Sequence, residues 1–353
     1  MSLLISIEEI IKDHNKILPF SGAVLVRGMG ETFKRSYGYA NRSEQIPNDS
    51  KTRFGIASGC KIFTSVAICQ LVQDGLLTFD SFLKDCLNFS FPNFDPKITI
   101  HHLLTHSSGI PDYFDEEIMG DFEELWKKYS MYSMQSPKDF LPLFQNGQMK
   151  CSPGEGFSYN NAGFILLGLV VEQVTGIEFS EYVDMNIFQR SGMLDSGYFR
   201  LDQLPERTAL GYIDEDQTWK TNIYSLPIKG GPDGGAFTTV NDLSIFWDAL
   251  FNYRLLSREY TEILLTPHIQ EDGHIYYGYG VWILMIDDQI FKYFVMGSDP
   301  GVIMQSSIYA KSKMHAHIIG NISKGAGRIA SKRWHRLTKY SNYGTFQPKI
   351  RVI

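Results

Sequence analysis

Cysteine is scarce in this sequence. The 353 residues include four cysteines, Cys60, Cys69, Cys86 and Cys151, and no two of them have the C-x-x-C spacing of zinc or thiol-redox sites. Four cysteines are too few to hold a chain of this length together by disulfides. We therefore expect free thiols.

Long apolar runs are also absent. The start, Met1 to Ile7, is apolar, but Glu8 and Glu9 interrupt it too early for a signal-peptide core. No stretch reaches the roughly 18 apolar residues that a membrane span requires. The chain as written is expected to be cytoplasmic and without a membrane span, while loss of a native leader before Met-Ser-Leu would be compatible with export.

An excess of positive charge is missing too. The 33 Lys and Arg residues against 39 Asp and Glu give a net charge of −6, so binding to a nucleic-acid backbone has no electrostatic basis. The 43% apolar and 20% charged composition is close to the globular average, which argues against a disordered or low-complexity protein. We expect a folded domain.

Strand patterns lie at both ends of the chain, and helical patterns fill the middle. The expected strands cover residues 22–27, 34–39, 280–286, 290–296, 302–309 and 315–321. The expected helices cover residues 62–77, 100–105, 162–175 and 240–251, and a basic amphipathic stretch at 328–337 predicts one more over the sheet. The pattern indicates an α/β (α+β) fold, in which an antiparallel sheet flanked by helices joins a mostly helical lobe.

This distribution predicts a single domain of two lobes. The α/β lobe is expected at about 1–60 and 230–345, and the helical lobe at about 61–229. A cleft between two lobes is the usual place for a site. The sequence assigns no role to the tail at 338–353 and does not fix the oligomeric state.

A Ser-x-x-Lys sequence, Ser58-Gly-Cys-Lys61, opens the predicted helix at 62–77. Residues three apart in a helix share a face, so the two side chains can touch. Exposed N–H groups at a helix N-terminus stabilise developing negative charge, which suits a hydroxyl that becomes a nucleophile. Lys61 can serve as its general base, provided that burial or nearby positive potential leaves it uncharged near neutral pH.

Tyr159-Asn-Asn161 lies in a turn-rich loop that leads into the predicted helix at 162–175. A phenol that is hydrogen-bonded to Ser58 and Lys61 can relay a proton. The amide of Asn161 can hold both the lysine and a substrate amide oxygen. The loop therefore supplies two further candidates for the same site.

Both patterns also occur elsewhere in the chain. Ser81-Phe-Leu-Lys84 repeats the first spacing, but it follows a predicted helix end and lies in a loop, where no free N–H groups would face an oxyanion. Tyr-x-Asn recurs at 39–41 and 340–342, without the glycine loop and buried helix that flank Tyr159. Context, rather than spacing, favours Ser58 and Tyr159.

Order and context together resemble the serine β-lactamase and penicillin-binding-protein superfamily, particularly its class C β-lactamase-like branch. The resemblance covers most of the chain, through residues 54–75, 98–111, 153–168, 234–243, 277–280 and 297–301. It implies a β-lactamase/transpeptidase-like fold with Ser58 as the acylated nucleophile, Lys61 and Tyr159 as general bases, and Asn161 as a ligand of substrate and lysine. It also implies small-molecule or peptide acyl substrates, β-lactams among them, and no cofactor.

The third family motif, Lys-Thr-Gly or His-x-Gly on the strand that borders the site, is replaced by Val295-Met296-Gly297. Family members use the cation or imidazole to recognise a substrate carboxylate and to tune the tyrosine, and Val295 can do neither. Lys292 lies on the opposite face of a regular strand. Gly297 still permits close substrate approach, and the Ser298 N–H can pair with that of Ser58 as an oxyanion hole.

The leading hypothesis is a serine hydrolase that works through a Ser58 acyl-enzyme. Because Val295 removes the carboxylate partner, we rank penicillin-binding, D-amino-acid-peptidase or esterase activity ahead of an efficient β-lactamase. The alternative is a catalytically inactive family member that binds a peptide or cell-wall fragment. His102-Leu-Leu-Thr-His106 has helical i,i+4 histidines, but it lacks the Glu of a zincin and a third ligand, so we expect no metal site.

Overall fold

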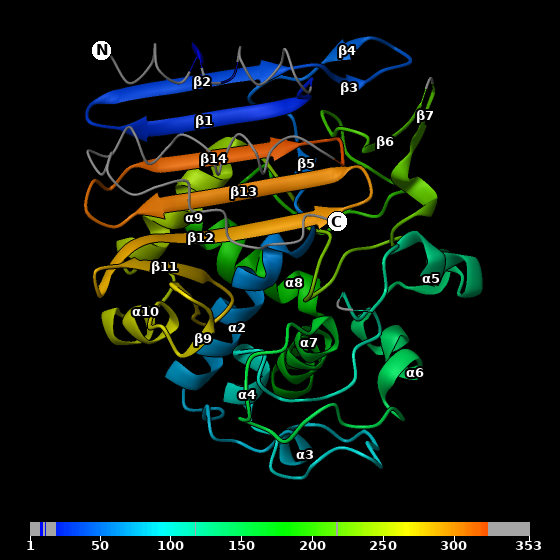
Figure 1. Cartoon of the computed structure of the whole chain (residues 1–353), viewed down its shortest axis with the longest axis vertical. Coiled ribbons are helices and arrows are strands. Elements are labelled where there is room, and N and C mark those ends of the chain that lie inside the picture. The colour runs from blue at the N-terminus through cyan, green and yellow to red at the C-terminus, as the bar shows by residue number, and fades with distance from the viewer. Residues whose placement is uncertain (1–7, 10, 12–18, 117, 217, 324–353) are drawn as a thin grey trace.

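The computed structural model describes residues 8–9, 11, 19–116, 118–216 and 218–323. One antiparallel sheet of eight strands dominates it, in the order β2-β1-β14-β13-β12-β11-β10-β9, with most helices below and behind it (Figure 1). These strands are β1 (Gly22–Gly28), β2 (Glu31–Tyr37), β9 (Ile269–Asp272), β10 (Ile275–Tyr277), β11 (Trp282–Ile286), β12 (Gln289–Asp299), β13 (Val302–Tyr309) and β14 (His315–Gly320). Strands from the two ends of the described chain meet where β1 pairs with β14.

Short strands form three small two-stranded ladders outside the main sheet. They are β3 (Tyr39–Asn41) with β4 (Ile46–Pro47), β5 (Phe54–Gly55) with β8 (Phe237–Thr238), and β6 (Tyr212–Glu215) with β7 (Thr218–Thr221). The pairing of β5 with β8 matters for the site, because β5 leads directly into the turn that carries Ser58.

The helices fall mainly in the middle of the chain. The α-helices are α2 (Lys61–Gln73), α3 (Leu83–Cys86), α4 (Ile100–Leu104), α5 (Glu123–Lys128), α6 (Leu141–Phe144), α7 (Asn161–Thr175), α8 (Phe179–Val183), α9 (Val240–Phe251) and α10 (Arg258–Leu264). Single-turn segments are η1 (Ala57–Cys60), η2 (Met131–Ser133), η3 (Pro137–Phe140) and η5 (Asn222–Tyr224), and η4 (Asp184–Gln189) has π-helical geometry. The lobe boundaries inferred from sequence stay a prediction.

Both faces of the sheet are buried. In β1, Ala23 and Leu25 join the large core that includes the helices, whereas Val24 and Val26 belong to a second cluster on the other face. This follows from the side-chain alternation of a strand. It explains why the strand reads as a continuous apolar run rather than as an alternating one.

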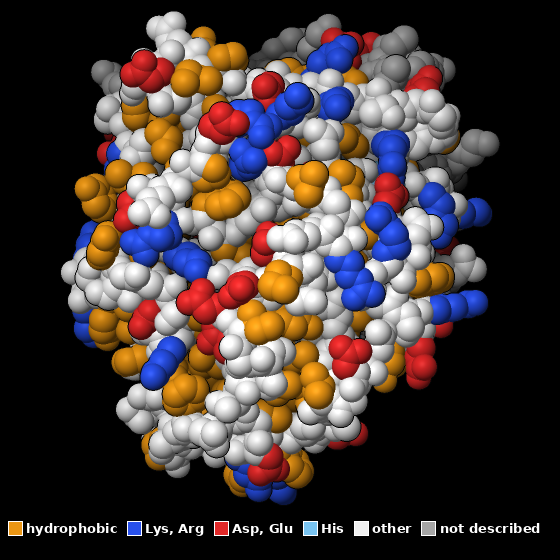
Figure 2. Space-filling view, turned by 180° about the vertical axis from the view of Figure 1, so that it is seen from behind, with side chains coloured by type: hydrophobic (Ala, Val, Ile, Leu, Met, Phe, Trp, Pro, Cys, Tyr) orange, Lys and Arg blue, Asp and Glu red, His pale blue; other side chains and the backbone are white. Residues whose placement is uncertain are grey.

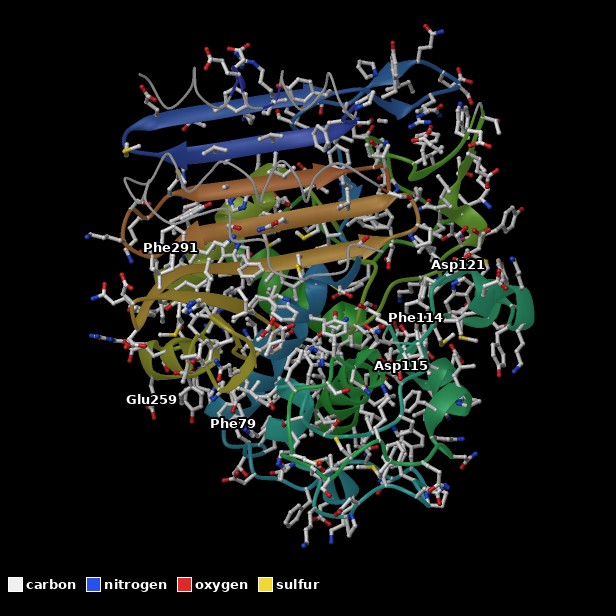
Figure 3. All side chains as sticks on the ribbon, in the orientation of Figure 1. Phe79, Phe114, Asp115, Asp121, Glu259 and Phe291 are labelled. Carbon is white, nitrogen blue, oxygen red and sulfur yellow. The ribbon has the colours of Figure 1, made fainter. Side chains whose placement is uncertain are left out.

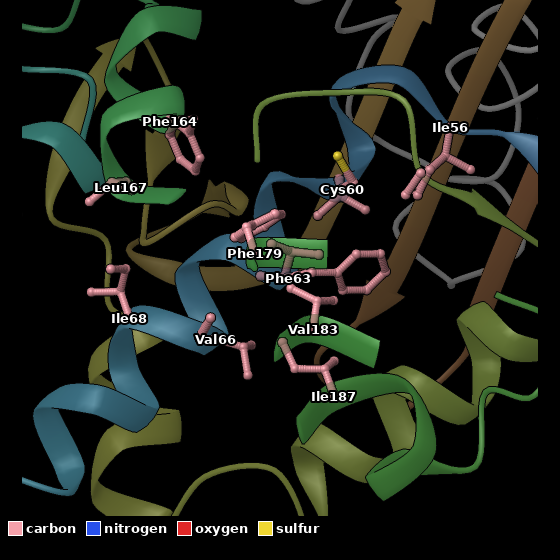
Figure 4. Close-up of a cluster of buried hydrophobic side chains, with 14 of the residues drawn as sticks. Ile56, Cys60, Phe63, Val66, Ile68, Phe164, Leu167, Phe179, Val183 and Ile187 are labelled. Atoms are coloured by element: carbon pink, nitrogen blue, oxygen red, sulfur yellow. The ribbon is translucent and has the colours of Figure 1, made fainter. Parts of the chain in front are cut away.

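The helix α2 lies at the centre of the molecule. Its residues from Lys61 to Leu71 are all buried, and Phe63 lies within the cluster of apolar side chains drawn in Figure 4. The Phe63 ring contacts the rings of Phe188 and Phe246 at centroid distances of 5.0 Å each. A helix that is apolar all round is a core helix. The helix α7 is buried in the same way over its first eleven residues, from Asn161 to Val171.

Several sequence-based boundaries were wrong. The helix predicted at 62–77 ends at Gln73, because Gly75 adopts a left-handed backbone with φ of +73° that stops the helix. The strand predicted from Gly280 begins at Trp282, after a turn in which Gly280 has φ of +70°. The polar edge strand β9 was missed, since its exposed, charged residues lack the apolar alternation of a strand.

Other predictions can now be placed. All four cysteines are free thiols, as expected. The predicted helix at 328–337, the Tyr-x-Asn at 340–342 and the tail lie outside the described residues.

Within the described part, no single helix is long and apolar enough to cross a membrane. The two helices Asn161–Thr175 and Phe179–Gln189 together have the length and composition of a span, but they are bent by 82° relative to each other. On the face seen in Figure 2, acidic and basic side chains intermingle and do not gather into one basic patch.

Candidate active site

Ser58 lies in the single turn η1, directly before the helix α2. The turn occupies Ala57–Cys60, and α2 begins only at Lys61. Ala57 has a left-handed backbone with φ of +46°, which is rare for a residue with a Cβ. Such strain at the residue before a candidate nucleophile is typical of functional sites. The turn presents Ser58, partly exposed, to the cavity.

The amine of Lys61 is surrounded by three oxygen atoms. Its Nζ lies 2.8 Å from Ser58 Oγ, 2.8 Å from Asn161 Oδ1 and 2.6 Å from the carbonyl oxygen of Asp233. The lysine is only 2% exposed. The amide and carbonyl oxygens can only accept hydrogen bonds, so the amine donates to both, and it also lies within hydrogen-bond distance of the Ser58 hydroxyl. The structure therefore brings Ser58, Lys61 and Asn161 together.

Tyr159 completes the group from the loop before α7. Its phenol forms a hydrogen bond with Ser58, and the amine of Lys61 lies 4.9 Å from the centroid of its ring. Withdrawal from water raises the pKa of Tyr159 well above its ordinary value, and the nearby carboxylate of Glu116 adds to this effect. The hydrogen bond from Ser58 acts in the opposite direction. The resting phenol is therefore neutral at physiological pH.

The start of α7 holds Asn161 in place. Asn160 caps the helix, with its Oδ1 accepting a 2.7 Å hydrogen bond from Gly163 N–H. The carboxylate of Asp112 accepts hydrogen bonds from the N–H groups of Asn161 and Ala162, at 2.7 and 3.0 Å. Burial raises the pKa of Asp112 to about 7, and these N–H groups oppose the rise. The Asn161 side chain donates from Nδ2 to Asp112 Oδ2 at 3.4 Å and to the Phe114 carbonyl oxygen at 3.3 Å, so it is held by the segment that packs on the start of α7.

Gly297 brings β12 against the turn that carries the nucleophile. A Cβ at this position would lie 2.2 Å from the carbonyl oxygen of Ile56 and 2.9 Å from the N–H nitrogen of Ser58. The sequence analysis expected Gly297 to permit close approach of a substrate. The structure shows that a glycine is needed here because the backbone of Ile56 and Ser58 lies too close for a Cβ. Ser298, the next residue, is exposed and lines the cavity.

Val295 points away from the cavity into the main core. It is 3% exposed and shares a cluster with Ile56 and Cys60. Phe294 and Met296 belong to a separate cluster with Trp282, on the other face of the strand. The amine of Lys292 lies 4.6 Å from the centroid of the Phe294 ring, which confirms that this lysine and Val295 occupy opposite faces.

Sequence reasoning missed four acidic or phenolic groups around Lys61. Asp233 is 6% exposed and accepts a short hydrogen bond from the Tyr113 hydroxyl, and Glu116 forms a hydrogen bond with Asn161. Asp299, at the end of β12, interacts electrostatically with Lys61, Asp233 and Glu116. Removal from water raises the pKa of all three carboxyl groups, that of Asp299 to about 8, and Lys61 opposes the rise in each.

These groups line one cavity of about 1900 Å³ together with Ser58, Tyr159 and Asn161. Glu116 comes from the segment after Phe114 and Asp115, which lies beside α7 (Figure 3). Asp233 comes from the glycine-rich loop at 230–235, which lines the cavity. The only signal for these residues was that loop, since an isolated acidic residue carries no motif.

Comparison with known proteins agrees with this geometry. The family profile described as Beta-lactamase matches residues 8–291. Penicillin-binding protein 4* of Bacillus subtilis (strain 168) is 30% identical over 284 residues, which cover 75% of this chain and 60% of that protein. This chain therefore spans less than two thirds of the length of that relative.

Solved structures extend the comparison to the whole fold. The crystal structure of a penicillin-binding protein from Bacillus halodurans has 54% sequence identity and a TM-score of 0.88, covering 92% of this chain and 98% of that one. A D-amino acid amidase from Ochrobactrum anthropi SV3 shares the fold at 22% identity, with a TM-score of 0.76 over 92% of this chain and 94% of its own. The chain belongs to the β-lactamase family.

Proposed function

We propose that this protein hydrolyses amide or ester bonds through an acyl-enzyme on Ser58. The observation that carries the proposal is the position of the Lys61 amine, between the Ser58 hydroxyl and two oxygens that can only accept hydrogen bonds. In its uncharged form, an amine at this position can take the proton of the serine as the serine oxygen attacks a carbonyl. Tyr159, hydrogen-bonded to the same serine, offers a second route for the proton.

The reaction balances without a cofactor. The Ser58 oxygen bonds to the carbonyl carbon, and its proton passes to the uncharged Lys61 amine, either directly or through Tyr159, whose own proton then moves on to Lys61. The leaving amine or alcohol takes up a proton as its bond to carbon breaks. Water then attacks the ester, which releases a carboxylic acid and restores the serine. We assign the Ser58 and Ser298 N–H groups to the oxygen that becomes negative in both steps. The contact of Gly297 with the Ser58 backbone supports this pairing.

The charge of the cavity narrows the substrate class. Glu116, Asp233 and Asp299 face Lys61, and Val295 supplies no cation. Lys220, which also lines the cavity, is paired with Glu123 and Glu215 at 3.0 Å each. The other lysines of the lining are also engaged: Lys127 pairs with Glu124, Lys229 with Glu178, and Lys292 packs on the Phe294 ring. Acidic side chains outnumber lysines in the lining, which disfavours a substrate carboxylate and favours neutral substrates or those with an ammonium group. We therefore rank amino-acid amides, small peptides and esters ahead of penicillins, whose carboxylate lacks a partner.

Chemical labelling tests the reaction. The protein is incubated with a fluorophosphonate or a fluorescent penicillin, and the adduct is located by peptide mass spectrometry. We expect one adduct, on Ser58, that disappears in Ser58→Ala and persists in the matched control Ser81→Ala. Labelling that persists in Ser58→Ala would refute the assignment.

A matched substrate series tests the substrate class. D-Phenylalanine p-nitroanilide, which has a positive ammonium group, is compared with its neutral N-acetyl form and its negatively charged N-succinyl form. The three substrates differ in charge at the amino end only. We expect kcat/KM to fall in that order. Fastest turnover of the succinyl form would overturn the charge argument while leaving the acyl-enzyme intact.

The alternative function is binding without turnover. Val295 in place of the family's cation motivates it, since that cation tunes the tyrosine in active members. Absence of any Ser58 adduct and of ester or nitrocefin hydrolysis, combined with saturable binding of a muropeptide, would favour this alternative.

A further inference from the structure

The histidine pair at 102 and 106 has a different role from the metal site that its spacing suggests. Among the described residues, no group of three His, Cys, Asp or Glu side chains is arranged to hold a metal ion. His106 is 1% exposed and lies beyond the end of α4, with a left-handed backbone at φ of +56°. Such a conformation is uncommon for a residue other than glycine and is typical of a fixed functional position.

His106 holds the residues on both sides of Tyr159. Its carbonyl oxygen accepts a 2.8 Å hydrogen bond from Ser158 N–H. Its ring Nδ1 accepts a 3.1 Å hydrogen bond from Asn160 N–H. One residue therefore binds the backbone immediately before and immediately after the tyrosine.

The ring of His106 also packs against the phenol itself. The two ring centroids are 4.4 Å apart. The rings of Phe157 and Phe164 also pack against the imidazole, with centroid distances of 5.7 and 5.0 Å. With this packing, the Tyr159 ring has little freedom to move away from Ser58. Buried rings in close contact move only by displacing each other.

The hydrogen bonds fix the tautomer of the imidazole. Because Nδ1 accepts from a backbone N–H, the ring proton is on Nε2, which lies 3.2 Å from the Tyr277 hydroxyl oxygen and donates to it. Burial lowers the pKa of His106 well below its ordinary value, and the charge of Lys61 adds to this effect. A proton on Nδ1 would break the bond to Asn160, so the neutral ring is the one that fits.

We propose that His106 is a positioning residue for acylation, which fixes the Tyr159 phenol at the Ser58 hydroxyl by binding the backbone on both sides of the tyrosine. The inference rests on the proposed acyl-enzyme function of Ser58. It gives the His-x-x-x-His motif two separate tasks, since His102 belongs to the capping box of α4.

Two substitutions at position 106 separate the hydrogen bond from the bulk of the side chain. His106→Asn keeps an acceptor close to the position of Nδ1 and tolerates a left-handed backbone. His106→Leu has a similar branched shape without an acceptor. The matched controls are His102→Asn and His102→Leu, because Nδ1 of His102 also accepts a 3.1 Å hydrogen bond from a backbone N–H, that of Thr99.

The first measurement is the rate of Ser58 acylation by a fluorophosphonate, alongside kcat, KM and thermal unfolding. We expect His106→Leu to slow acylation about ten- to a hundredfold with little change in KM, which is the order of loss caused by a misplaced catalytic group. His106→Asn should recover most of that rate, and both His102 variants should acylate at the wild-type rate whatever their thermal stability. Equal acylation by His106→Leu and wild type, or equal losses in the Leu variants at 102 and 106, would overturn the proposal.

The second measurement does not depend on activity. A fluorotyrosine placed at position 159 reports its surroundings through its ¹⁹F resonance. We expect this resonance to shift and broaden in His106→Leu and to stay unchanged in His102→Leu. An unchanged resonance in His106→Leu would overturn the positioning role, whereas failure of wild-type protein to form a Ser58 adduct would instead refute the proposed function.

Discussion

Two regions of the molecule carry the same Ser-x-x-Lys spacing with opposite outcomes. Lys61 is 2% exposed and contacts Ser58, whereas Lys84 is exposed and lies over the ring of Phe82. The Ser81 hydroxyl binds the backbone N–H and the hydroxyl of Thr78 and does not reach Lys84. The spacing alone therefore does not create a reactive pair.

The difference lies in what each segment packs against. Ser58 precedes a fully buried helix and lies under β12, so other segments deliver acceptors to its lysine. Ser81 precedes α3, a single helical turn at Leu83–Cys86 that the sequence analysis had placed in a loop. A short surface helix has no partner that could enclose a lysine. Burial by distant segments turns a common spacing into a candidate site.

The largest difference in kcat/KM is expected between the variants Ser58→Ala and Ser81→Ala. Loss of the nucleophile should lower kcat/KM for an ester or amide substrate by about a thousandfold or more, as in other serine hydrolases. The second variant should keep wild-type activity. Initial rates on a p-nitrophenyl ester and on an amino-acid p-nitroanilide measure both, and comparable losses in the two variants would remove the distinction.

A second contrast compares Lys61→Met with Lys84→Met. Removal of the buried amine leaves the Ser58 proton without its proposed acceptor, so acylation should slow by about a hundred- to ten-thousandfold. Removal of the exposed amine should change neither rate nor stability measurably. Rapid acylation of Lys61→Met would transfer the base role to Tyr159, a result that Tyr159→Phe in the same assay would identify.

Gly297→Ala tests whether β12 positions the turn of Ser58. The added Cβ would meet the Ile56 carbonyl oxygen at 2.2 Å, so the strand and the turn must separate. We expect about a hundredfold slower acylation and a loss of roughly 1–3 kcal/mol in the free energy of unfolding. Gly120→Ala, where nothing lies within 4 Å, serves as the control. Full activity in Gly297→Ala would contradict this role.

Lys292 is a second buried lysine, and its surroundings differ from those of Lys61. Lys61 has three oxygen partners, whereas Lys292 is 6% exposed and packs on Phe294, and burial lowers its pKa to about 8. The unfolded lysine titrates near 10.4, so the unfolded chain binds more protons between about pH 8 and 10.4 and wild-type stability rises across this window. Lys292→Met should be more stable at pH 7 by on the order of 1–3 kcal/mol, with the gain shrinking above pH 8.

Urea unfolding at pH 7 and at pH 10 measures this effect. Lys84→Met should show no such dependence on pH. A gain that is the same at both pH values would show that the charge of Lys292 carries no cost.

A small but measurable loss of stability is expected for Ser81→Ala. The Ser81 hydroxyl accepts a 2.9 Å hydrogen bond from Thr78 N–H at the surface. Its loss should cost about 0.5–1 kcal/mol of stability. Differential scanning calorimetry can detect a change of this size, and a loss several times larger would reveal a structural role for this turn that its exposure does not suggest.

Local patterns predicted much of this fold and part of this site. The helix at 240–251 was predicted at its observed bounds, and α7 differs by one residue, because both have strong apolar periodicity and clear ends. Ser58, Lys61, Tyr159 and Asn161 were found because each lies in a short motif at a helix start.

The site residues that the sequence analysis did not predict are brought together by contacts between distant segments of the chain. Asp233, Glu116 and Asp299 approach Lys61 from three loops or strand ends, and no local pattern marks them. The role of Gly297 against Ile56 and Ser58 likewise appears only when strand and turn are placed together.

The three oxygens around the Lys61 amine come from positions 58, 161 and 233, which the unfolded chain keeps far apart. A covalent label on Ser58 would thus form only on molecules that have completed their tertiary structure. The fraction labelled in a pulse would count folded molecules directly, during refolding or in a mixture with denaturant, with no need for a dye or an optical signal.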